Sequence, residues 1–289
     1  MYLAFILNPV AGAGYAPAVM EKLEALLRER KADYRVFRTE RPGHASELAR
    51  ALAADPEVRA VVSVGGDGTA FEVAGGLAGS EKPMGILPAG TGNDFIKSAG
   101  IPSDPVKALE TVLRGRTVTA DLGVLNAGSF LNVCGTGFDV TVLDYAESLK
   151  KRFRGLLPYF LGLLKAIVHY RPVHLKLTAD GREEEGDFLI CSVANGRYIG
   201  GGIPICPAAD ISDGKLDLVL VRNVPRRRIP LYLPGLMLGK VLSFRITRHL
   251  LVDQVSLESE GMRVNVDGEI FSMDRVSFGV RPGVLRLIR

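Results

Sequence analysis

Three glycines and one acid follow directly after a short apolar segment in the first half of the chain. Residues 61–64 are mostly β-branched and predict a buried strand, and Ala70–Leu77 predicts a helix. Between them lies Gly65-Gly66-Asp67-Gly68-Thr69, a glycine turn whose main-chain N–H groups could bind a phosphate at a helix N-terminus. Because Asp67 would repel a phosphate unless a cation lay between them, the turn points to Mg²⁺. A tight turn in which Asp67 only caps the helix has the same pattern and stays open.

A second glycine turn also carries an acid. Gly90-Thr91-Gly92-Asn93-Asp94 follows a short predicted strand at Met84–Leu87. If the two strands belong to one parallel sheet, Asp67 and Asp94 lie at the same edge, where ligands of such sheets bind. Paired acids there suit a metal–phosphate site, although Asx turns look the same in sequence.

A third glycine turn, Asn8–Gly14, contains G-x-G but has Pro17 where the dinucleotide fingerprint needs its last glycine. Phosphate contact and a plain strand-to-helix turn are equally compatible with it. The chain also lacks the P-loop pattern and the HRD and DFG signatures of protein kinases. A Rossmann dehydrogenase and a P-loop enzyme are therefore disfavoured.

Two Asp-Gly pairs occur in the second half of the chain. One lies in Val264-Asn265-Val266-Asp267-Gly268-Glu269 and the other in Ser212-Asp213-Gly214-Lys215-Leu216-Asp217. Asp-Gly is the common two-residue turn of β-hairpins. The spacing alone therefore predicts a hairpin at each site.

The elements that must position these turns change character near residue 120. Before it, strands and helices alternate, which predicts a doubly wound α/β domain over residues 1–120. The expected strands are 3–7, 33–38, 61–64 and 84–87, and the expected helices are 16–30, 45–53, 70–77 and 105–114. After it, period-two patterns predict an antiparallel β-sandwich domain over 121–289 with helical inserts near 140–165 and 226–242. The expected strands there are 121–125, 130–134, 174–179, 188–194, 215–221, 252–258, 262–266 and 275–280.

The 289 residues, 47% hydrophobic and 24% charged, have the composition of an ordinary globular protein of one or two domains. No apolar run reaches the roughly eighteen residues that span a bilayer, and the N-terminus predicts a first strand, not a signal peptide. The three widely spaced cysteines predict core residues of a reduced, cytosolic protein. The four histidines have no zinc-ligand spacing, so the sequence predicts no zinc site.

The net charge of +4 is concentrated in two basic clusters: Lys150, Lys151, Arg152 and Arg154, and Arg222, Arg226, Arg227 and Arg228. Such clusters are commonly solvated surface, but they also suit an anionic membrane or a phosphorylated ligand. Aromatic residues do not alternate with the basic ones as on a nucleic-acid stacking surface. We therefore expect no nucleic-acid partner.

The motifs are far more specific together than singly. GGDGT, LPAGTGNDF, VANGRYIGGG, SDGKLD and VDGE occur in this order along the chain. The ordered set resembles the diacylglycerol kinase catalytic-domain family, in particular its bacterial soluble lipid kinases, which are related to sphingosine and ceramide kinases and more distantly to NAD kinases. The resemblance covers about residues 2 to 287. It implies a nucleotide-binding α/β domain, a β-sandwich domain and an active site in the cleft between them.

The resemblance also implies roles by position. Asp67 and Asp94 would act through Mg²⁺ and orient the phosphates, while Asp267 and Glu269 would face the acceptor hydroxyl. One of the latter two would be the general base, and the sequence does not choose between them. Asp213, with the main-chain carbonyls of Leu216 and Leu218, would form a structural Mg²⁺ site. The residues implied to hold ATP are Asn8, Thr39, Gly65, Gly66, Asp67, Gly68, Thr69, Thr91 and Asn93.

The function that the resemblance implies is ATP-dependent phosphorylation of a lipid hydroxyl by a cytoplasmic enzyme that works transiently at the inner face of the membrane. Diacylglycerol, which would give phosphatidic acid, is the favoured acceptor. Sphingoid bases, ceramide, undecaprenol and NAD are alternatives, NAD being disfavoured by the Gly90–Asp94 segment. A non-catalytic lipid- or nucleotide-binding regulator is a further alternative, and an exposed strand edge could support a homodimer.

Overall fold

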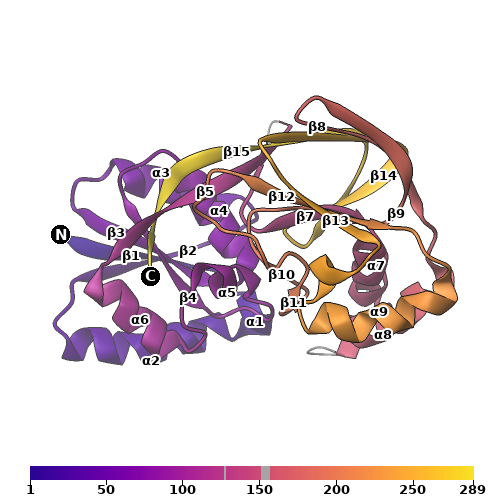
Figure 1. Cartoon of the computed structure of the whole chain (residues 1–289). Helices are drawn as coiled ribbons and strands as arrows, with labels where there is room; N and C mark the ends of the chain where they lie inside the picture. Colours follow the sequence, from indigo (N-terminus) through magenta and orange to yellow (C-terminus); the bar gives the residue numbers. More distant parts are fainter. Residues whose placement is uncertain (127, 151–156) are drawn as a thin grey trace. The chain divides into compact units, whose positions relative to one another are not determined.

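The computed structural model describes residues 1–126, 128–150 and 157–289 (Figure 1). The contacts divide them into two units, Met1–Leu122 with Arg281–Arg289 and Gly123–Val280. The sequence-based boundary at 120/121 assigned the whole C-terminal segment to the second domain. The structure differs there, because the end of strand β15 (Glu269–Ile288) pairs in parallel with β4 (Pro83–Pro88) of the first unit.

The first unit is built on a parallel sheet with the order β15-β4-β3-β1-β2. Its other elements are β1 (Tyr2–Leu7), α1 (Ala11–Gly14), α2 (Ala16–Glu29), β2 (Tyr34–Arg38), α3 (His44–Ala54), β3 (Val58–Gly65), α4 (Asp67–Leu77), α5 (Asp94–Ala99), α6 (Pro105–Arg114) and β5 (Thr117–Leu125). Helices α3 and α4 cover one face of the sheet, and α2 and α6 cover the other (Figure 1). Every residue of β1 is therefore buried, as the unbroken apolar pattern predicts.

Three local features of the first unit differ from the sequence-based prediction. Helix α4 begins at Asp67, three residues before the predicted start, so the acid belongs to its first turn. Helix α5 was not predicted, because six residues are too few to show a helical period. The turn after β1 contains a single helical turn, α1, in which Gly12 and Ala13 have positive φ.

The second unit is mostly antiparallel, and its core lies between its strands. Its elements are β6 (Gly128–Phe130), β7 (Val133–Gly137), α7 (Phe138–Lys150), α8 (Leu157–His169), β8 (Val173–Ala179), β9 (Arg182–Ala194), β10 (Tyr198–Ile199), β11 (Ile203–Pro204), β12 (Leu216–Arg222), η1 (Arg226–Arg228), α9 (Ile229–Met237), η2 (Val241–Ser243), β13 (Thr247–Val252) and β14 (Gln254–Val266). The long strands β9 and β14 each pair with β8 near one end and with β7 near the other. The aliphatic core enclosed in this way includes Leu177, Leu218 and Leu257.

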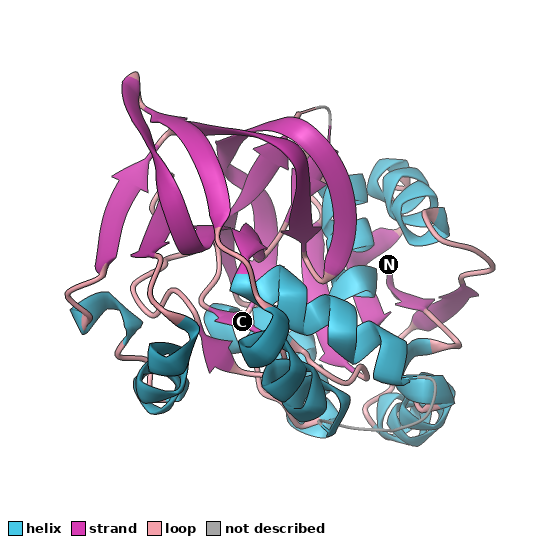
Figure 2. Cartoon of the chain, turned by 90° about the vertical axis from the view of Figure 1, so that its right-hand side faces the viewer, coloured by secondary structure: helices cyan, strands magenta, loops and turns pink. Residues whose placement is uncertain are grey.

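Helices cover one face of these strands (Figure 2). A second apolar cluster lies on that face. It joins Val219 and Val221 of β12 to Tyr170 at the end of α8 and Ile229 of α9. No helix in the described part of the chain has the length and apolar character needed to cross a membrane.

The strand prediction missed β13, split β14 in two where its register shifts after Glu258, and joined β6 to the start of β7.

Candidate active site

The three glycine turns meet at the carboxyl ends of β1, β3 and β4. The Ala89 N–H donates to the Gly65 carbonyl at 2.8 Å, which joins the turn after β4 to the end of β3. A Cβ on Gly90 would collide with the Gly66 Cα, and a Cβ on Gly12 would collide with the Ala89 carbonyl oxygen. The turns therefore pack main chain against main chain, an arrangement that only glycine allows.

The polar residues implied to hold ATP gather at the same edge of the sheet. Asn8 Nδ2 donates to Thr69 Oγ1 at 3.1 Å, so the end of β1 is tied to the first turn of α4. The Thr39 N–H donates to the Leu7 carbonyl at 2.9 Å, which places the end of β2 beside them. Gly68 and Thr91 are exposed. The structure thus brings Asn8, Thr39 and the Gly65–Thr69 turn together.

Asp67 links two of these turns. Its Oδ1 accepts from the Phe95 N–H at 3.0 Å, and the Asp94 N–H also stabilises its charge. Asp67 therefore caps α5, a helix that the sequence did not reveal, whereas α4 follows Gly66 without a side-chain cap. Asp67 does cap a helix, as the alternative interpretation of this turn predicted. The capped helix is α5, which follows the second glycine turn, and not α4.

The carboxylates of Asp67 and Asp94 converge beside Gly92. Asp94 is buried, and its Oδ1 accepts from Lys97 Nζ at 2.8 Å. The second oxygens, Asp67 Oδ2 and Asp94 Oδ2, lie 3.2 and 3.6 Å from the position that a Cβ of Gly92 would take. Burial raises the pKa of Asp67, and the negative charge of Asp94 raises it further. The two carboxylates offer oxygen ligands of the kind that Mg²⁺ prefers. A bound Mg²⁺ would also relieve the repulsion between the negative charges of Asp67 and Asp94.

Asn93 has a more local part than expected. Its Oδ1 accepts from the Gly90 N–H at 3.1 Å, and its Nδ2 donates to the Gly90 carbonyl at 2.9 Å. The residue itself has a positive φ of 49°. Asn93 therefore shapes the second glycine turn, and its contact with ATP stays a prediction.

The VDGE segment of the second unit forms the predicted hairpin. Val266 pairs with Glu269, and the two residues between them, Asp267 and Gly268, have φ values of 48° and 100°. Positive φ at both positions is the geometry of a type I′ turn, which favours Asp-Gly. The hairpin prediction at this site is confirmed.

The Asp267 carboxylate does more than a turn residue needs. It accepts from three successive main-chain N–H groups, those of Leu131 at 2.6 Å, Asn132 at 2.9 Å and Val133 at 3.0 Å. These bonds hold the hairpin against the segment between β6 and β7. Glu269 is exposed at the start of β15. The two acids are therefore not equivalent, since the first is held by amides and the second is accessible.

Asp139, at the start of α7, is an acid that the sequence analysis missed. Its Oδ1 is buried without a hydrogen-bond partner among the described residues. Burial raises its pKa to about 6, although the side chain of Asn265 opposes that shift. Asn265 Oδ1 in turn accepts from the Gly268 N–H at 2.8 Å. Asn265 therefore connects Asp139 to the turn of the hairpin. The only signal in the sequence was an acid at a strand-to-helix junction, Gly137-Phe138-Asp139.

The second Asp-Gly pair is not a hairpin. Among the described strands β12 pairs with β9 and β13, and the residues before Asp213 form turns around Pro207. The hairpin prediction there is wrong, because residues 205–215 form turns, including one closed by the Ala209 N–H and the Cys206 carbonyl, and no strand there pairs with β12. Asp213 is exposed and its Oδ1 accepts from the Lys215 N–H at 3.0 Å. With the carbonyls of Leu216 and Leu218 in β12 it offers only oxygen donors, so its chemistry suits Mg²⁺, and the site stays a prediction.

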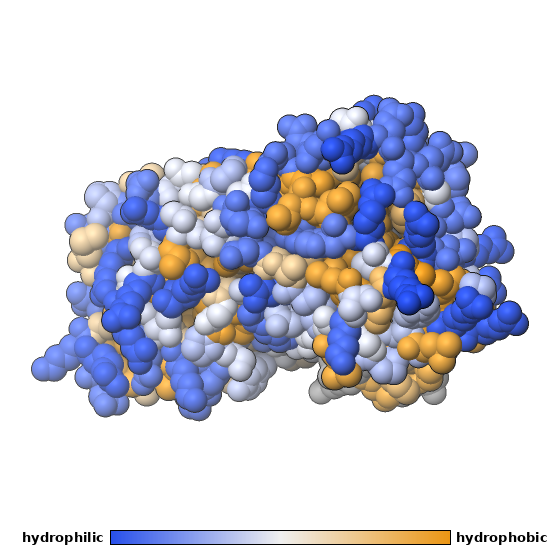
Figure 3. Space-filling view, in the orientation of Figure 1, coloured by the Kyte–Doolittle hydropathy of each residue, from blue (hydrophilic) through white to orange (hydrophobic). Residues whose placement is uncertain are grey.

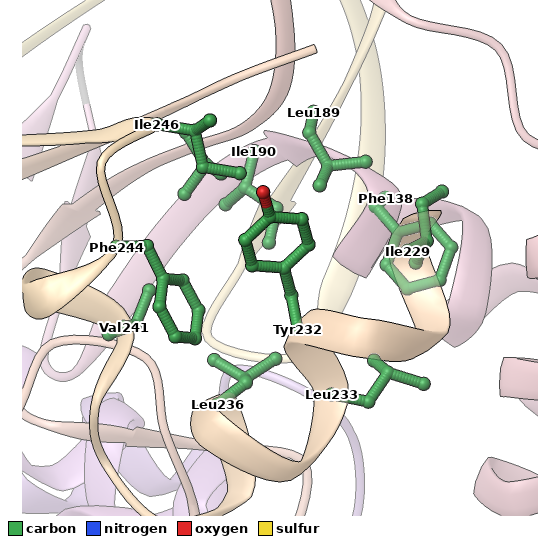
Figure 4. A pocket seen from close by; sticks show the side chains of 11 residues that line it. Phe138, Leu189, Ile190, Ile229, Tyr232, Leu233, Leu236, Val241, Phe244 and Ile246 are labelled. Carbon is green, nitrogen blue, oxygen red and sulfur yellow. The ribbon is translucent and has the colours of Figure 1, made fainter. Parts of the chain in front are cut away.

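An apolar pocket lies beneath α9 in the second unit (Figure 4). The Tyr232 ring occupies its middle and directs its hydroxyl toward Ile190 (Figure 4). Phe138, the neighbour of Asp139 in the chain, is part of the wall. The lining residues are Phe138, Leu189, Ile190, Val221, Ile229, Tyr232, Leu233, Leu236, Val241, Phe244 and Ile246.

Known proteins resemble the chain over both units. Residues 2–125 match the diacylglycerol kinase catalytic domain family, and residues 132–289 match the YegS C-terminal NAD kinase beta sandwich-like domain. A diacylglycerol kinase of Mycobacterium tuberculosis (strain ATCC 25618 / H37Rv) is 31% identical over 289 residues, with 98% of this chain and 93% of that protein covered. A Pseudomonas aeruginosa protein (strain UCBPP-PA14), named "Probable lipid kinase YegS-like", is 36% identical over 236 residues, or 78% of this chain and 75% of that protein.

The fold agrees with these relatives. A crystal structure titled as a diacylglycerol kinase from Bacillus anthracis str. Sterne has a TM-score of 0.71 at 23% identity, with 99% of this chain and 96% of that chain covered. The predicted α/β and β-sandwich architecture is therefore confirmed, as is the resemblance carried by the ordered motifs. The chain belongs to the diacylglycerol kinase family and is a lipid kinase.

Proposed function

We propose that the chain transfers the γ-phosphoryl group of ATP to a lipid hydroxyl with Mg²⁺, and that diacylglycerol is the acceptor and phosphatidic acid the product. The observation that carries the proposal is the convergence of three glycine turns and two carboxylates, Asp67 and Asp94, at one edge of the first sheet. Phosphoryl transfer depends on positioned phosphates and neutralised charge more than on a strong nucleophile. This edge offers both.

Each part of the chain has a distinct task in this reaction. The N–H groups at the start of α4 would bind the phosphates, and Asp67 with Asp94 would hold the ion. Mg²⁺-ATP, when bound, supplies the transferred group with its charge neutralised. We assign Glu269 as the base that accepts the hydroxyl proton while the lipid oxygen bonds to the γ-phosphorus and ADP leaves. Asp267 positions the hairpin that carries Glu269, since its oxygens already accept three main-chain N–H groups.

The apolar pocket beneath α9 supports a lipid acceptor. Its wall consists of aliphatic and aromatic side chains, with Tyr232 as the polar exception. A pocket of this kind favours hydrocarbon, at about 0.8 kcal/mol for each buried CH₂ group. The apolar character of this wall therefore favours a hydrocarbon acceptor over the polar adenosine of NAD.

Exposed apolar side chains on α8 support work at a membrane surface. Leu157, Phe160, Leu164 and Val168 are exposed and recur every three or four residues, so they form one stripe along the helix. Leu231, Met237 and Leu238 add exposed apolar area on and just after α9. Apolar side chains gathered in this way mark an interaction surface (Figure 3).

A basic turn lies next to this stripe. Arg226 Nη1 donates to the Val168 carbonyl at 3.0 Å, which fastens η1 to the end of α8. Arg222 and Arg226–Arg228 are all exposed. Each basic side chain near an anionic bilayer contributes about 1 kcal/mol. We infer that this face binds an anionic, cytoplasmic leaflet. Of the first basic cluster, Lys151, Arg152 and Arg154 lie outside the described residues.

The proposed reaction is tested by incubating the purified chain with radiolabelled ATP and separate preparations of diacylglycerol, sphingosine, ceramide, undecaprenol and NAD. Labelled phosphatidic acid is expected, and both a chelator and the Asp67→Ala substitution should abolish it. Label on a different acceptor would replace diacylglycerol as the substrate. Nucleotide binding without label on any acceptor would instead establish a regulator.

Membrane binding is tested by co-sedimentation with vesicles of phosphatidylcholine alone or mixed with phosphatidylglycerol. The wild-type chain should sediment with the anionic vesicles, and Phe160→Asp should reduce that fraction several-fold. Leu251→Asp is the matched control, because Leu251 on β13 is 55% exposed and Phe160 is 56% exposed. Equal loss in both variants would contradict a specific membrane face.

The homodimer stays a prediction. Strand β13 ends the order of the described sheet and offers an open edge of the kind that could pair with a second copy. Sedimentation velocity at several concentrations would decide between monomer and dimer.

A further inference from the structure

An acid occupies an apolar position on the helix-covered face of β12. Leu216, Leu218 and Leu220 point into the core between the strands, whereas Val219 and Val221 point into the second apolar cluster. Asp217 lies two residues before Val219, so its side chain points to the same face of β12 as these two valines. Only 1% of Asp217 is exposed. A carboxylate at such a position requires partners that compensate its lost hydration. The proposed phosphoryl transfer gives it no task.

The partners of Asp217 are an imidazole and a thiol. His249 lies on β13 opposite Val219, so it shares the face of Asp217, and its Nε2 lies 2.5 Å from Asp217 Oδ1. Cys206, in the loop before β12, is fully buried and hydrogen bonded to the same carboxyl group. One ligand atom from each of the three residues lies within 4.8 Å of the other two.

Burial and the neighbouring Asp217 carboxylate raise the pKa of the Cys206 thiol, so a bound cation would have to displace its proton. The N–H groups of Ala208 and Ala209 oppose that rise without cancelling it, and the Ala209 N–H donates to the Cys206 carbonyl at 3.2 Å. The loop is held in turn by the Cys206 N–H, which donates to the Arg197 carbonyl at 3.1 Å. The thiolate is the form of cysteine that binds metals, so the cluster offers a metal site by its geometry and donor set.

We propose that Cys206, Asp217 and His249 bind one divalent cation of the zinc class, which fastens the Cys206 loop and the edge strand β13 to β12. A thiolate, a carboxylate and an imidazole are the three ligand types of protein zinc sites. Adjacent ligands in a tetrahedral zinc site lie about 3.3 to 3.8 Å apart for ordinary bond lengths. Side-chain shifts of about 1 Å therefore convert the present cluster into such a site, with water as a fourth ligand.

The donor set distinguishes this site from the predicted magnesium sites. Mg²⁺ prefers oxygen ligands, and two of the three groups here present sulfur and nitrogen. The rival explanation is a hydrogen-bonded triad that simply satisfies Asp217. In that triad the hydrogen bond from Cys206 to Asp217 would be weak, because a thiol is a weak hydrogen-bond donor. A bound ion would instead be coordinated by all three side chains. The sequence predicted no zinc site because its ligands are spread over residues 206 to 249 and meet only after β12 pairs with β13.

The site is tested by removing metals from the full chain with a chelator and titrating it with Co²⁺. One equivalent should bind and give the visible bands of tetrahedral cobalt and a near-ultraviolet sulfur-to-cobalt band. Zn²⁺ should abolish both, while excess Mg²⁺ should leave them unchanged. Cys206→Ser should remove the sulfur band, and His249→Gln, which can still donate to Asp217, should weaken Co²⁺ binding at least tenfold.

Two matched controls separate this cluster from other cysteines and histidines. Cys191→Ser removes a buried thiol elsewhere, and His174→Gln alters an exposed imidazole that lies 2.8 Å from Asp187 and 3.0 Å from Glu185. Both should keep the full cobalt spectrum. Absence of tetrahedral cobalt in the wild-type chain, or an unchanged sulfur band in Cys206→Ser, would overturn the proposal. Circular dichroism of each variant checks that it is folded.

Discussion

Gly66 and Gly90 lie main chain against main chain, although they come from different glycine turns. The closest neighbour of a Cβ built on Gly90 is the Gly66 Cα, and the Asn93 Oδ1 would lie 2.9 Å from it. Neither neighbour is the end of a flexible side chain that could move aside, because Asn93 is held by two hydrogen bonds to Gly90. The contact therefore sets the distance between the turn that carries Asp67 and the turn that carries Asp94.

Gly90→Ala should separate these two turns. We expect a loss of about 2 to 3 kcal/mol in the free energy of unfolding, as for overpacking at a rigid site, and a loss of lipid kinase activity of at least a hundredfold. Urea unfolding and initial rates measure the two effects. Gly68→Ala is the control for stability, since its Cβ would have no neighbour within 4 Å. Equal stability of the Gly90→Ala and Gly68→Ala variants would show that the two turns can move apart without a cost in stability.

The two acids of the hairpin should respond differently to neutralisation. Asp267→Asn leaves fewer acceptors for the N–H groups of Leu131, Asn132 and Val133 and should reduce stability by about 2 kcal/mol. Glu269→Gln, at an exposed position, should change stability by less than about 0.5 kcal/mol but reduce kcat by about 10² to 10⁴-fold. Unfolding curves and steady-state kinetics measure both. A fully active Glu269→Gln would move the role of base to another acid.

Asp139 should make stability depend on pH in a definite direction. Burial raises its pKa in the folded chain to about 6, above its ordinary value of 3.8. The unfolded chain therefore loses this proton first, and the contribution of Asp139 to stability is complete below pH 3.8 and is lost as the pH rises through 6. Asp139→Asn should accordingly exceed the wild-type chain in free energy of unfolding at pH 8 by about 2 to 3 kcal/mol, and match it near pH 4.

Asp144 on the same helix provides a control of opposite sign. Hydrogen bonds from Arg263 at 2.8 Å lower its pKa, so its contribution is present at neutral pH and lost as the pH falls. Asp144→Asn should be less stable than the wild-type chain at pH 8 and converge with it in acid. Urea unfolding at pH 4, 6 and 8 tests both variants. Parallel behaviour of the two variants would contradict the burial of Asp139.

Filling the apolar pocket should change the preferred lipid. Leu236 lines the pocket, and Leu236→Trp adds side-chain volume to its wall. We expect a preference for shorter acyl chains, seen as a larger fall in kcat/KM for dioleoylglycerol than for dioctanoylglycerol. Leu238→Trp is the control, because Leu238 is 70% exposed just after the same helix. An unchanged ratio in Leu236→Trp would show that the pocket does not hold the acyl chain.

Much of the fold was predictable because its signals are local. The unbroken apolar character of β1 and the mostly apolar residues 61–64 of β3 predict a sheet covered on both faces. Helix α6 has the predicted bounds because Asp104 caps it and Gly115 ends it. Strand β13 and helix α5 were missed because neither shows a clear period. The end of β15 was assigned to the wrong unit because parallel pairing with β4 leaves no mark in the sequence.

The sequence by itself determined the family, since the order of GGDGT, GTGND, SDGKLD and VDGE along the chain is a property of the sequence alone. Only the tertiary structure decided how these residues act on one another. It made Asp67 the cap of a helix that begins at Asp94, surrounded Asp267 with three amides, and brought Cys206, Asp217 and His249 together. The physical reason is that hydrogen bonds and burial act over a few ångströms in space, and strand pairing places residues at that distance regardless of their separation in the chain.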